Sequence, residues 1–203
     1  MKKMLLILWA SAICLFVGVS CSSSASLPGT DEEHAYDALQ RAADWNEIVQ
    51  RYQQSPPQSL ACRKVAQLAM FHLGRAGREA VYECLSDSHD VLTTETAALM
   101  MSDVYMQLGF VAMAQRAAFE GMVNVLDVKR NERALRRLTE TALVMGQYEL
   151  ALKYISIVED NFSSSEWVQT MRPMAMNPEL IMQHPVFGKL RVEYEKQKDQ
   201  FFL

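Results

Sequence analysis

The chain has 203 residues, of which 50% are hydrophobic, and its formal net charge is -4. This length and apolar content suffice for one domain with a hydrophobic core and exclude a chain that is disordered throughout. The acidic balance argues against general nucleic-acid binding, which depends on a basic surface. Glycine and proline are scarce, at 8 and 6 residues, while residues that favour helices are common. Composition therefore predicts an all-α fold.

The first segment, residues 1–20, has the pattern of a secretion signal. Lys2 and Lys3 precede an uncharged, mostly apolar run over residues 4–19. This run is shorter than the roughly 20 residues that a membrane-spanning helix needs, and it fits the apolar region of a signal peptide. Retention as an uncleaved membrane anchor and ordinary cleavage nearby are the alternatives.

Residues 18–21 read Gly-Val-Ser-Cys and resemble the lipobox of bacterial lipoproteins, in which Leu-x-(Gly/Ala/Ser) precedes a cysteine. Gly18 stands where that pattern has leucine. The resemblance implies cleavage before Cys21 and lipid attachment to it, and several acyl chains on one residue anchor a protein stably. It implies a lipid-anchored protein of the cell envelope, and Ser22 favours the outer membrane, facing the periplasm. Residues 21–32 are small and polar and predict a flexible tether.

A repeated pattern runs through residues 33–162, which we expect to form a helical-repeat domain. Each unit has a helical run, a turn that contains glycine, and a second helical run. The clear units cover 68–85, 104–122 and 142–160, and a weaker unit covers 34–59. Residues 163–203 are expected to form a C-terminal helical cap, because the segment from Pro185 to about Gln200 is amphipathic and suits the exposed end of a stack.

The last unit reads Gly146-Gln147-Tyr148-Glu149-Leu150-Ala151 and resembles the turn of the tetratricopeptide repeat, whose period is about 34 residues. The resemblance implies a right-handed superhelix of antiparallel helical hairpins, a tetratricopeptide-like α-solenoid with a C-terminal capping helix. An accidental match on an ordinary helical bundle is the alternative. In each unit a small or apolar residue is expected to lie where the two helices approach closely; these residues are Ile48, Ala80, Ala114 and Ala151.

A looser resemblance links the chain to an uncharacterised family of bacterial envelope proteins. It is based on Gln58-Ser59-Leu60, Met113-Ala114-Gln115-Arg116 and Arg137-Leu138-Thr139-Glu140-Thr141. That family has no assigned activity, so the resemblance supports the helical fold and implies nothing about function.

First helices of tetratricopeptide repeats line a concave surface that often holds a peptide or a partner helix. Carried over by position, this resemblance implies a partner-binding groove on the third and fourth hairpins. The alternative is that these residues only support a solvated helix, because Glu132 and Glu140 each stand four residues from Arg136. The candidate groove residues are Leu99, Asp103, Met106, Arg133, Arg136, Glu140 and Leu143.

The sequence lacks the common motifs of metal, cofactor and nucleophile sites. It has no His-Glu-x-x-His, Cys-x-x-Cys or Gly-x-Ser-x-Gly motif and no phosphate-binding loop, so we expect no enzyme, no metal and no cofactor. Cys62 and Cys84 flank a predicted turn at unequal distances, which separates them beyond the reach of a disulfide. We therefore expect two buried thiols.

These observations predict a non-catalytic protein-protein interaction scaffold or adaptor, anchored to the membrane through lipid on Cys21. Its partner would be another envelope protein or a peptide segment, and no nucleic acid. One alternative is an accessory subunit that docks on an envelope membrane complex by its convex face or its tail. Another is a small ligand-binding protein or hydrolase with an unrecognised cleft. The oligomeric state stays open.

Overall fold

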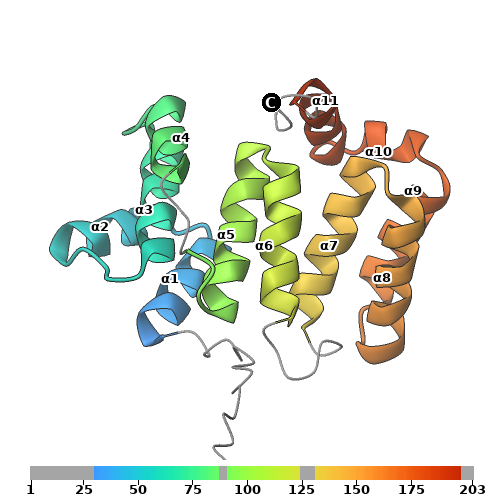
Figure 1. Cartoon of the computed structure of the whole chain (residues 1–203), viewed down its shortest axis with the longest axis horizontal. Helices are drawn as coiled ribbons and strands as arrows, with labels where there is room; N and C mark the ends of the chain where they lie inside the picture. The colour runs from blue at the N-terminus through green and yellow to red at the C-terminus, as the bar shows by residue number, and fades with distance from the viewer. Residues whose placement is uncertain (1–29, 87–90, 124–130, 198–203) are drawn as a thin grey trace, which may run out of the picture.

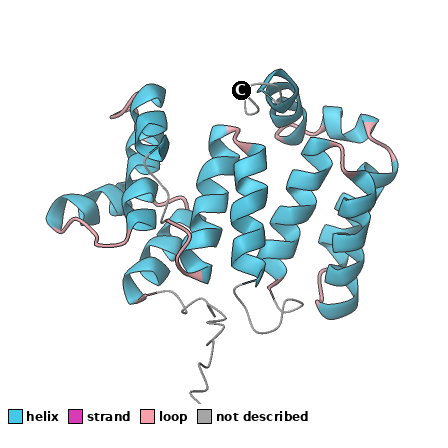
Figure 2. Cartoon of the chain, in the orientation of Figure 1, coloured by secondary structure: helices cyan, strands magenta, loops and turns pink. Residues whose placement is uncertain are grey.

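The structure, a computed structural model, describes residues 30–86, 91–123 and 131–197, and within these ranges it contains eleven helices and no strand (Figure 1, Figure 2). The predicted all-α fold is confirmed. Cys21, the signal and most of the tether lie outside the described residues. The helices are α1 (Asp31–Arg41), α2 (Trp45–Gln54), α3 (Leu60–His72), α4 (Arg78–Ser86), α5 (Glu95–Leu108), α6 (Val111–Val123), α7 (Glu132–Met145), α8 (Tyr148–Asn161), α9 (Ser165–Met176), α10 (Glu179–Gln183) and α11 (Phe187–Gln197).

Most helices that follow one another in the chain pack against one another, whereas α5 packs on α3 and not on α4. Helices α5 to α8 stand side by side in chain order, and α9 continues the row on α8 (Figure 1). Helix α3 packs against α2, α4 and α5. Helix α1 departs from this order because it contacts α5 as well as α2 and α3. The first helix therefore bridges elements that are far from it in the sequence.

The helix ends follow from local chemistry. Thr94 and Asn131 cap α5 and α7, each with a side-chain oxygen that accepts a hydrogen bond from a backbone N–H three residues on. Such caps satisfy donors that have no partner in the first turn of a helix. Gly109 and Gly146 end the same two helices in the left-handed conformation that glycine adopts without steric cost. The turn glycine expected from the sequence of the last unit, Gly146, lies at one of these positions.

The close approach within each hairpin agrees with the sequence in three of the four units. Ile48, Ala114 and Ala151 are fully buried. Ala80 is exposed, and its neighbour Val81 is buried at 2% exposure instead. The physical reason lies in the preceding turn: residues 73–77 separate α3 from α4, whereas only two residues separate α5 from α6 and α7 from α8. The longer turn rotates α4 about its axis relative to the other units, so Val81 faces α3 in place of Ala80.

The C-terminal helices take a different place from the one the amphipathic tail suggested. Helix α9 packs on α8, whereas α11 packs on α10 and α7. Arg191 of α11 donates a hydrogen bond from Nη1 to the carbonyl oxygen of Val144, at 3.0 Å, beside the Gly146 turn. Helix α11 therefore lies at the turn end of α7, and not over the outer face of the last hairpin (Figure 1).

The Gly146 turn provides a test of this docking. A Cβ at Gly146 would lie 2.8 Å from Arg191 Nη1, whereas a Cβ at Gly74 would meet nothing within 4 Å; both glycines have positive φ, at +78° and +67°. Gly74→Ala should lower the free energy of unfolding by about 1 kcal/mol, the cost of the left-handed backbone. Gly146→Ala should cost about 0.5–1.5 kcal/mol more, because it displaces Arg191 from its hydrogen bond. Equal losses in urea denaturation would contradict the contact between α11 and the turn.

Within the described ranges, no helix combines the length and the apolar character that crossing a membrane requires.

Candidate functional site

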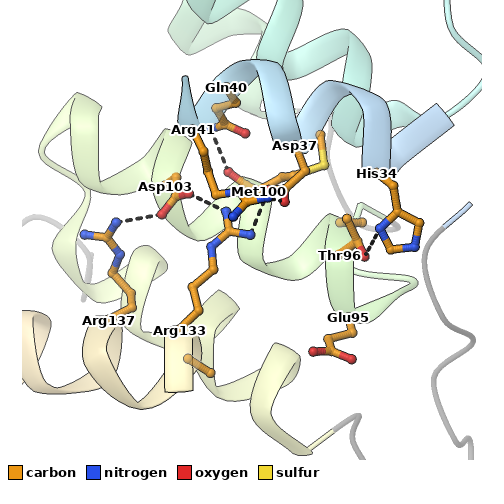
Figure 3. Close-up of polar contacts among 12 residues, drawn as sticks. His34, Asp37, Gln40, Arg41, Glu95, Thr96, Met100, Asp103, Arg133 and Arg137 are labelled. Carbon is orange, nitrogen blue, oxygen red and sulfur yellow. Dashed lines mark hydrogen bonds and ion pairs between the residues drawn. The ribbon is translucent and has the colours of Figure 1, made fainter. Parts of the chain in front are cut away.

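Three helices that are distant in the sequence are joined by a chain of ion pairs (Figure 3). Arg133 of α7 bridges two carboxylates: its Nη1 lies 2.7 Å from Asp37 Oδ1 of α1, and its Nη2 lies 2.5 Å from Asp103 Oδ2 of α5. Arg137 continues the chain, with Nη2 at 2.6 Å from the second oxygen of Asp103 and Nη1 at 2.7 Å from Glu140. Because each guanidinium contacts two carboxylates, the chain fixes α1, α5 and α7 relative to one another.

The charged residues surround an open cleft of about 530 Å³. Four of the predicted groove residues line it together: Asp103, Arg133, Arg136 and Glu140. The positions that the tetratricopeptide resemblance assigned to a groove therefore include four residues whose side chains share one surface. The remaining lining residues are Arg41, Glu132 and Arg137.

The apolar members of the predicted groove lie elsewhere. Leu99 and Leu143 are 6% and 0% exposed and belong to the hydrophobic core, so they do not reach the charged cleft. Helix α7 packs against α6, α8 and α11, and enclosure on several sides leaves only part of its surface free. Met106 is 6% exposed, but it borders a second cleft at the C-terminal end of α5.

This second cleft, of about 490 Å³, lies between the ends of α3 and α5 and the helices α7 and α11. The side chains that line it are mainly apolar, and the charged residues Arg78, Lys189 and Glu193 also border it. Arg137 lines both clefts. The charged cleft and the apolar cleft therefore adjoin at Arg137. The apolar side chains of the second cleft are Phe71, Met106, Leu108, Pro185, Val186 and Leu190.

Arg136 connects α7 to the next hairpin. Its Nη2 lies 2.5 Å from Glu132 and 2.8 Å from Ser164 Oγ, and its guanidinium lies over the Trp167 ring at 5.2 Å. Ser164 Oγ also donates a hydrogen bond to Glu132. Stacking on an aromatic face and bonding to a carboxylate together hold this arginine in one orientation at the edge of the charged cleft.

Sequence reasoning missed Asp37, which closes the chain of ion pairs. Asp37 is 6% exposed, although aspartate is seldom buried without a partner. A signal was available: Glu33, Tyr36, Asp37 and Gln40 lie at the i, i+3, i+4, i+7 spacing of a core-facing stripe. All four are buried. A polar stripe at this spacing indicates a helix that docks through hydrogen bonds and ion pairs.

The enclosure of the cluster changes its acid–base properties. Burial lowers the pKa of Arg133, but the charges of Asp103 and Asp37 raise it by more, so the arginine keeps its proton. Burial raises the pKa of the Glu140 carboxyl, and the charge of Arg137 only partly offsets this effect. The ionised form of Glu140 is therefore disfavoured in the folded chain.

Glu140→Gln should reveal this effect in the pH dependence of stability. Because the folded pKa of Glu140 lies above its ordinary value of 4.5, its contribution is most favourable below that value and declines as the pH rises through the folded pKa. The wild-type chain should lose free energy of unfolding relative to Glu140→Gln as the pH rises from 4.5 towards neutrality. Urea denaturation across this range measures the difference. A difference that moved in the other direction would show that pairing with Arg137 dominates.

A protein-family model matches residues 1–203, the whole chain, and its description is a family of unknown function (DUF6057). The chain belongs to the DUF6057 family. This agrees with the resemblance to an uncharacterised family. No curated protein and no solved structure matches the chain.

One thiol of this DUF6057 chain is a further candidate for chemistry among the residues that the structure describes. Cys62 is free and buried, and burial raises its pKa to about 12. A thiol that keeps its proton is a poor nucleophile and a poor metal ligand. The Cys84 side chain lies outside what the structure describes. Among the described residues, no group of three or more His, Cys, Asp and Glu side chains is placed to hold a metal ion.

Proposed function

We propose that this chain is a lipid-anchored envelope protein that acts as a non-catalytic adaptor and holds a segment of another protein across the two adjoining clefts. The observation that carries the proposal is the meeting of a charged cleft and an apolar cleft at Arg137. Protein-binding surfaces commonly combine an apolar pocket for an anchoring side chain with a polar surround that fixes orientation. A partner segment with an apolar side chain beside a charged one would match this pair.

The proposal includes a right-handed superhelix of tetratricopeptide-like hairpins. The left-handed glycines at 109 and 146 and the buried Ala114 and Ala151 support it, because these features allow sharp turns and close helix pairs. The order of packing from α5 to α9 is consistent with stacked hairpins. In such a stack the first helices of the hairpins share one surface, which is where Asp103 and Arg133 stand.

Anchoring at Cys21 is the second part of the proposal and is supported by the sequence pattern alone. A tether over residues 21–32 would reach on the order of 15–20 Å by random-coil scaling, so the clefts would work close to the membrane. Labelling cells with a palmitate analogue tests the anchor: Cys21→Ala should abolish incorporation. Incorporation that persisted in Cys21→Ala would remove lipid attachment at this residue.

Recovery of partners from detergent-solubilised envelopes tests the adaptor. Lys189 is exposed and lines the apolar cleft, so Lys189→Glu reverses a charge there without opening the core. The matched control is Arg116→Glu, an exposed change on α6 at a residue that lines neither of the two clefts. Proteins recovered with the wild-type chain and Arg116→Glu but lost with Lys189→Glu would support the proposal. Identical recovery with all three chains would contradict it.

A second candidate is an accessory subunit that docks by its outer face. Two large apolar side chains of α6 favour it, since Phe119 and Val123 are 47% and 43% exposed. Exposed apolar side chains that lie together can mark an interaction surface. Phe119→Lys should then abolish recovery of the partner, whereas Lys189→Glu should leave it unchanged.

A further inference from the structure

Helix α1 makes polar contacts with several other elements, beside the apolar packing of Tyr36 and Leu39 on the core. Glu33 accepts hydrogen bonds from Thr94 Oγ1 and Ser59 Oγ, both at 2.8 Å. Asp37 pairs with Arg133 at 2.7 Å, and Gln40 Nε2 donates to the Met100 carbonyl oxygen at 3.2 Å. The bonds therefore extend from one helix to the start of α3, to α5 and to α7. Figure 3 shows the contacts of Asp37 with Arg133 and of Gln40 with Met100.

The first turn of α1 adds a further carboxylate. Glu32 accepts hydrogen bonds from the backbone N–H groups of Gln58 and Ser59, at 3.2 and 2.8 Å. These groups lie just before α3, where the unpaired donors of a helix N-terminus favour negative charge. Helix α1 thus presents three carboxylates, Glu32, Glu33 and Asp37, and each meets a donor or a cation on another element.

Such a surface differs from the apolar packing between the later helices. Of the four side chains that α1 buries, only Tyr36 belongs to the hydrophobic core. Polar groups released from this surface can be hydrated again, so leaving it costs less than exposing an equal apolar area. Helix α1 also carries its own N-terminal capping box, formed by Thr30 and Glu33.

The link that follows α1 also bears on its release. Residues 42–44 connect α1 to α2, and Ala43 has φ +53°. This left-handed conformation is unfavourable for a residue with a Cβ. Opening of this turn would relieve the strain. Both the polar contacts and the turn therefore favour the release of α1.

We propose that the surface beneath α1 is a binding site for an acidic helix, occupied in this state by α1 itself and exchangeable for a partner helix with the same carboxylate spacing. Charge complementarity identifies the occupant: the site offers Arg133, the hydroxyls of Ser59 and Thr94, and the backbone N–H groups just before α3 that now bind Glu32. The partner helix would carry carboxylates four residues apart, as Glu33 and Asp37 are. This inference rests on the adaptor function and names the chemistry of its partner.

The exchange would also enlarge the proposed binding surface. Arg133 lines the charged cleft and at the same time pairs with Asp37. When α1 leaves, Arg133 loses one carboxylate and the charged cleft extends over the face of α5. A partner helix that enters the site would then continue directly into the two clefts.

A peptide of residues 30–42 serves as the probe. Asp37→Lys in the full chain sets a lysine against Arg133 and should release α1. Fluorescence anisotropy should then show the peptide binding to Asp37→Lys at least about tenfold more tightly than to the wild-type chain, in which α1 competes. The same peptide with lysine at position 37 should bind at least about tenfold more weakly. Asp31→Lys is the matched control, an exposed change on the same helix, and should behave as the wild-type chain does.

Two results would overturn the inference: no binding of the peptide to Asp37→Lys, or equal affinity for Asp37→Lys and the wild-type chain. If Asp37→Lys does not fold, hydrogen exchange on the wild-type chain tests the release of α1 instead. Amides of α1 should exchange at least about tenfold faster than those of α5 and α7, and an α1 that exchanged as slowly as α5 would overturn the proposal. The Lys189→Glu recovery experiment does not involve α1, so failure of the exchange and failure of the adaptor function are separate outcomes.

Discussion

Replacing Arg133 with methionine should lower the free energy of unfolding by about 3 kcal/mol. Methionine keeps an unbranched apolar stem but removes the guanidinium and the charge that pairs with Asp37 and Asp103. The side chains of these aspartates are only 9% and 15% exposed. Each would therefore remain a largely buried carboxylate but lose one of the cations that offset its charge. Urea denaturation monitored by circular dichroism at pH 7 measures the loss.

Arg41→Met is the matched control for this experiment. Arg41 pairs with the same Asp37 at 3.1 Å, but its own side chain is 59% exposed. An exposed pair contributes about 0–1 kcal/mol, so this variant should remain close to the wild-type chain. If Arg133→Met cost no more than Arg41→Met, the ion pairs would not hold α1, α5 and α7 together. The double variant Arg133→Met with Asp37→Asn should recover part of the loss, because it removes one of the stranded carboxylates.

Leu143→Ala should cost about 2–5 kcal/mol. The sequence placed Leu143 in a groove, where truncation would mainly affect binding, whereas the structure buries it completely. Removing its side chain leaves a cavity among α7 and its neighbours that the close-packed core fills only in part. Thermal and urea denaturation should both show the loss.

Leu60→Ala provides the comparison, since Leu60 is 40% exposed at the start of α3. A surface substitution of this kind should change the free energy of unfolding by about 0.5 kcal/mol or less. If Leu143→Ala lowered the free energy of unfolding as little as Leu60→Ala, the result would contradict the burial of Leu143. It would instead support the location of Leu143 in a groove.

The sequence predicted the helical hairpins well because their signals are local. A threonine or asparagine cap, a glycine in the left-handed conformation and a small residue at the helix approach each act within a few residues. Gly146, Ala114 and Ala151 all take their expected roles. The exception, Ala80, follows a longer turn, and the length of that turn is what changed the phase.

The arrangement of the site could be predicted only in part. Helix position identified Asp103, Arg133, Arg136 and Glu140 as neighbours on one surface, since residues three and four apart share a helix face. It could not identify Asp37, because the path of α1 across α5 depends on contacts between residues that are about 60 positions apart, such as Gln40 with Met100. Burial of Leu143 depends on helices that cover α7 from several sides, which periodicity along one helix does not reveal.

Site-specific photo-crosslinking in intact cells tests the adaptor function most directly. A crosslinking amino acid at Lys189 lies in the apolar cleft, and one at Arg116 lies on α6, away from both clefts. If the partner binds at the two clefts, we expect a discrete crosslinked protein from position 189 and none from position 116. Discrete crosslinks from position 116 with none from position 189 would contradict binding at the clefts and place the interaction on the outer face.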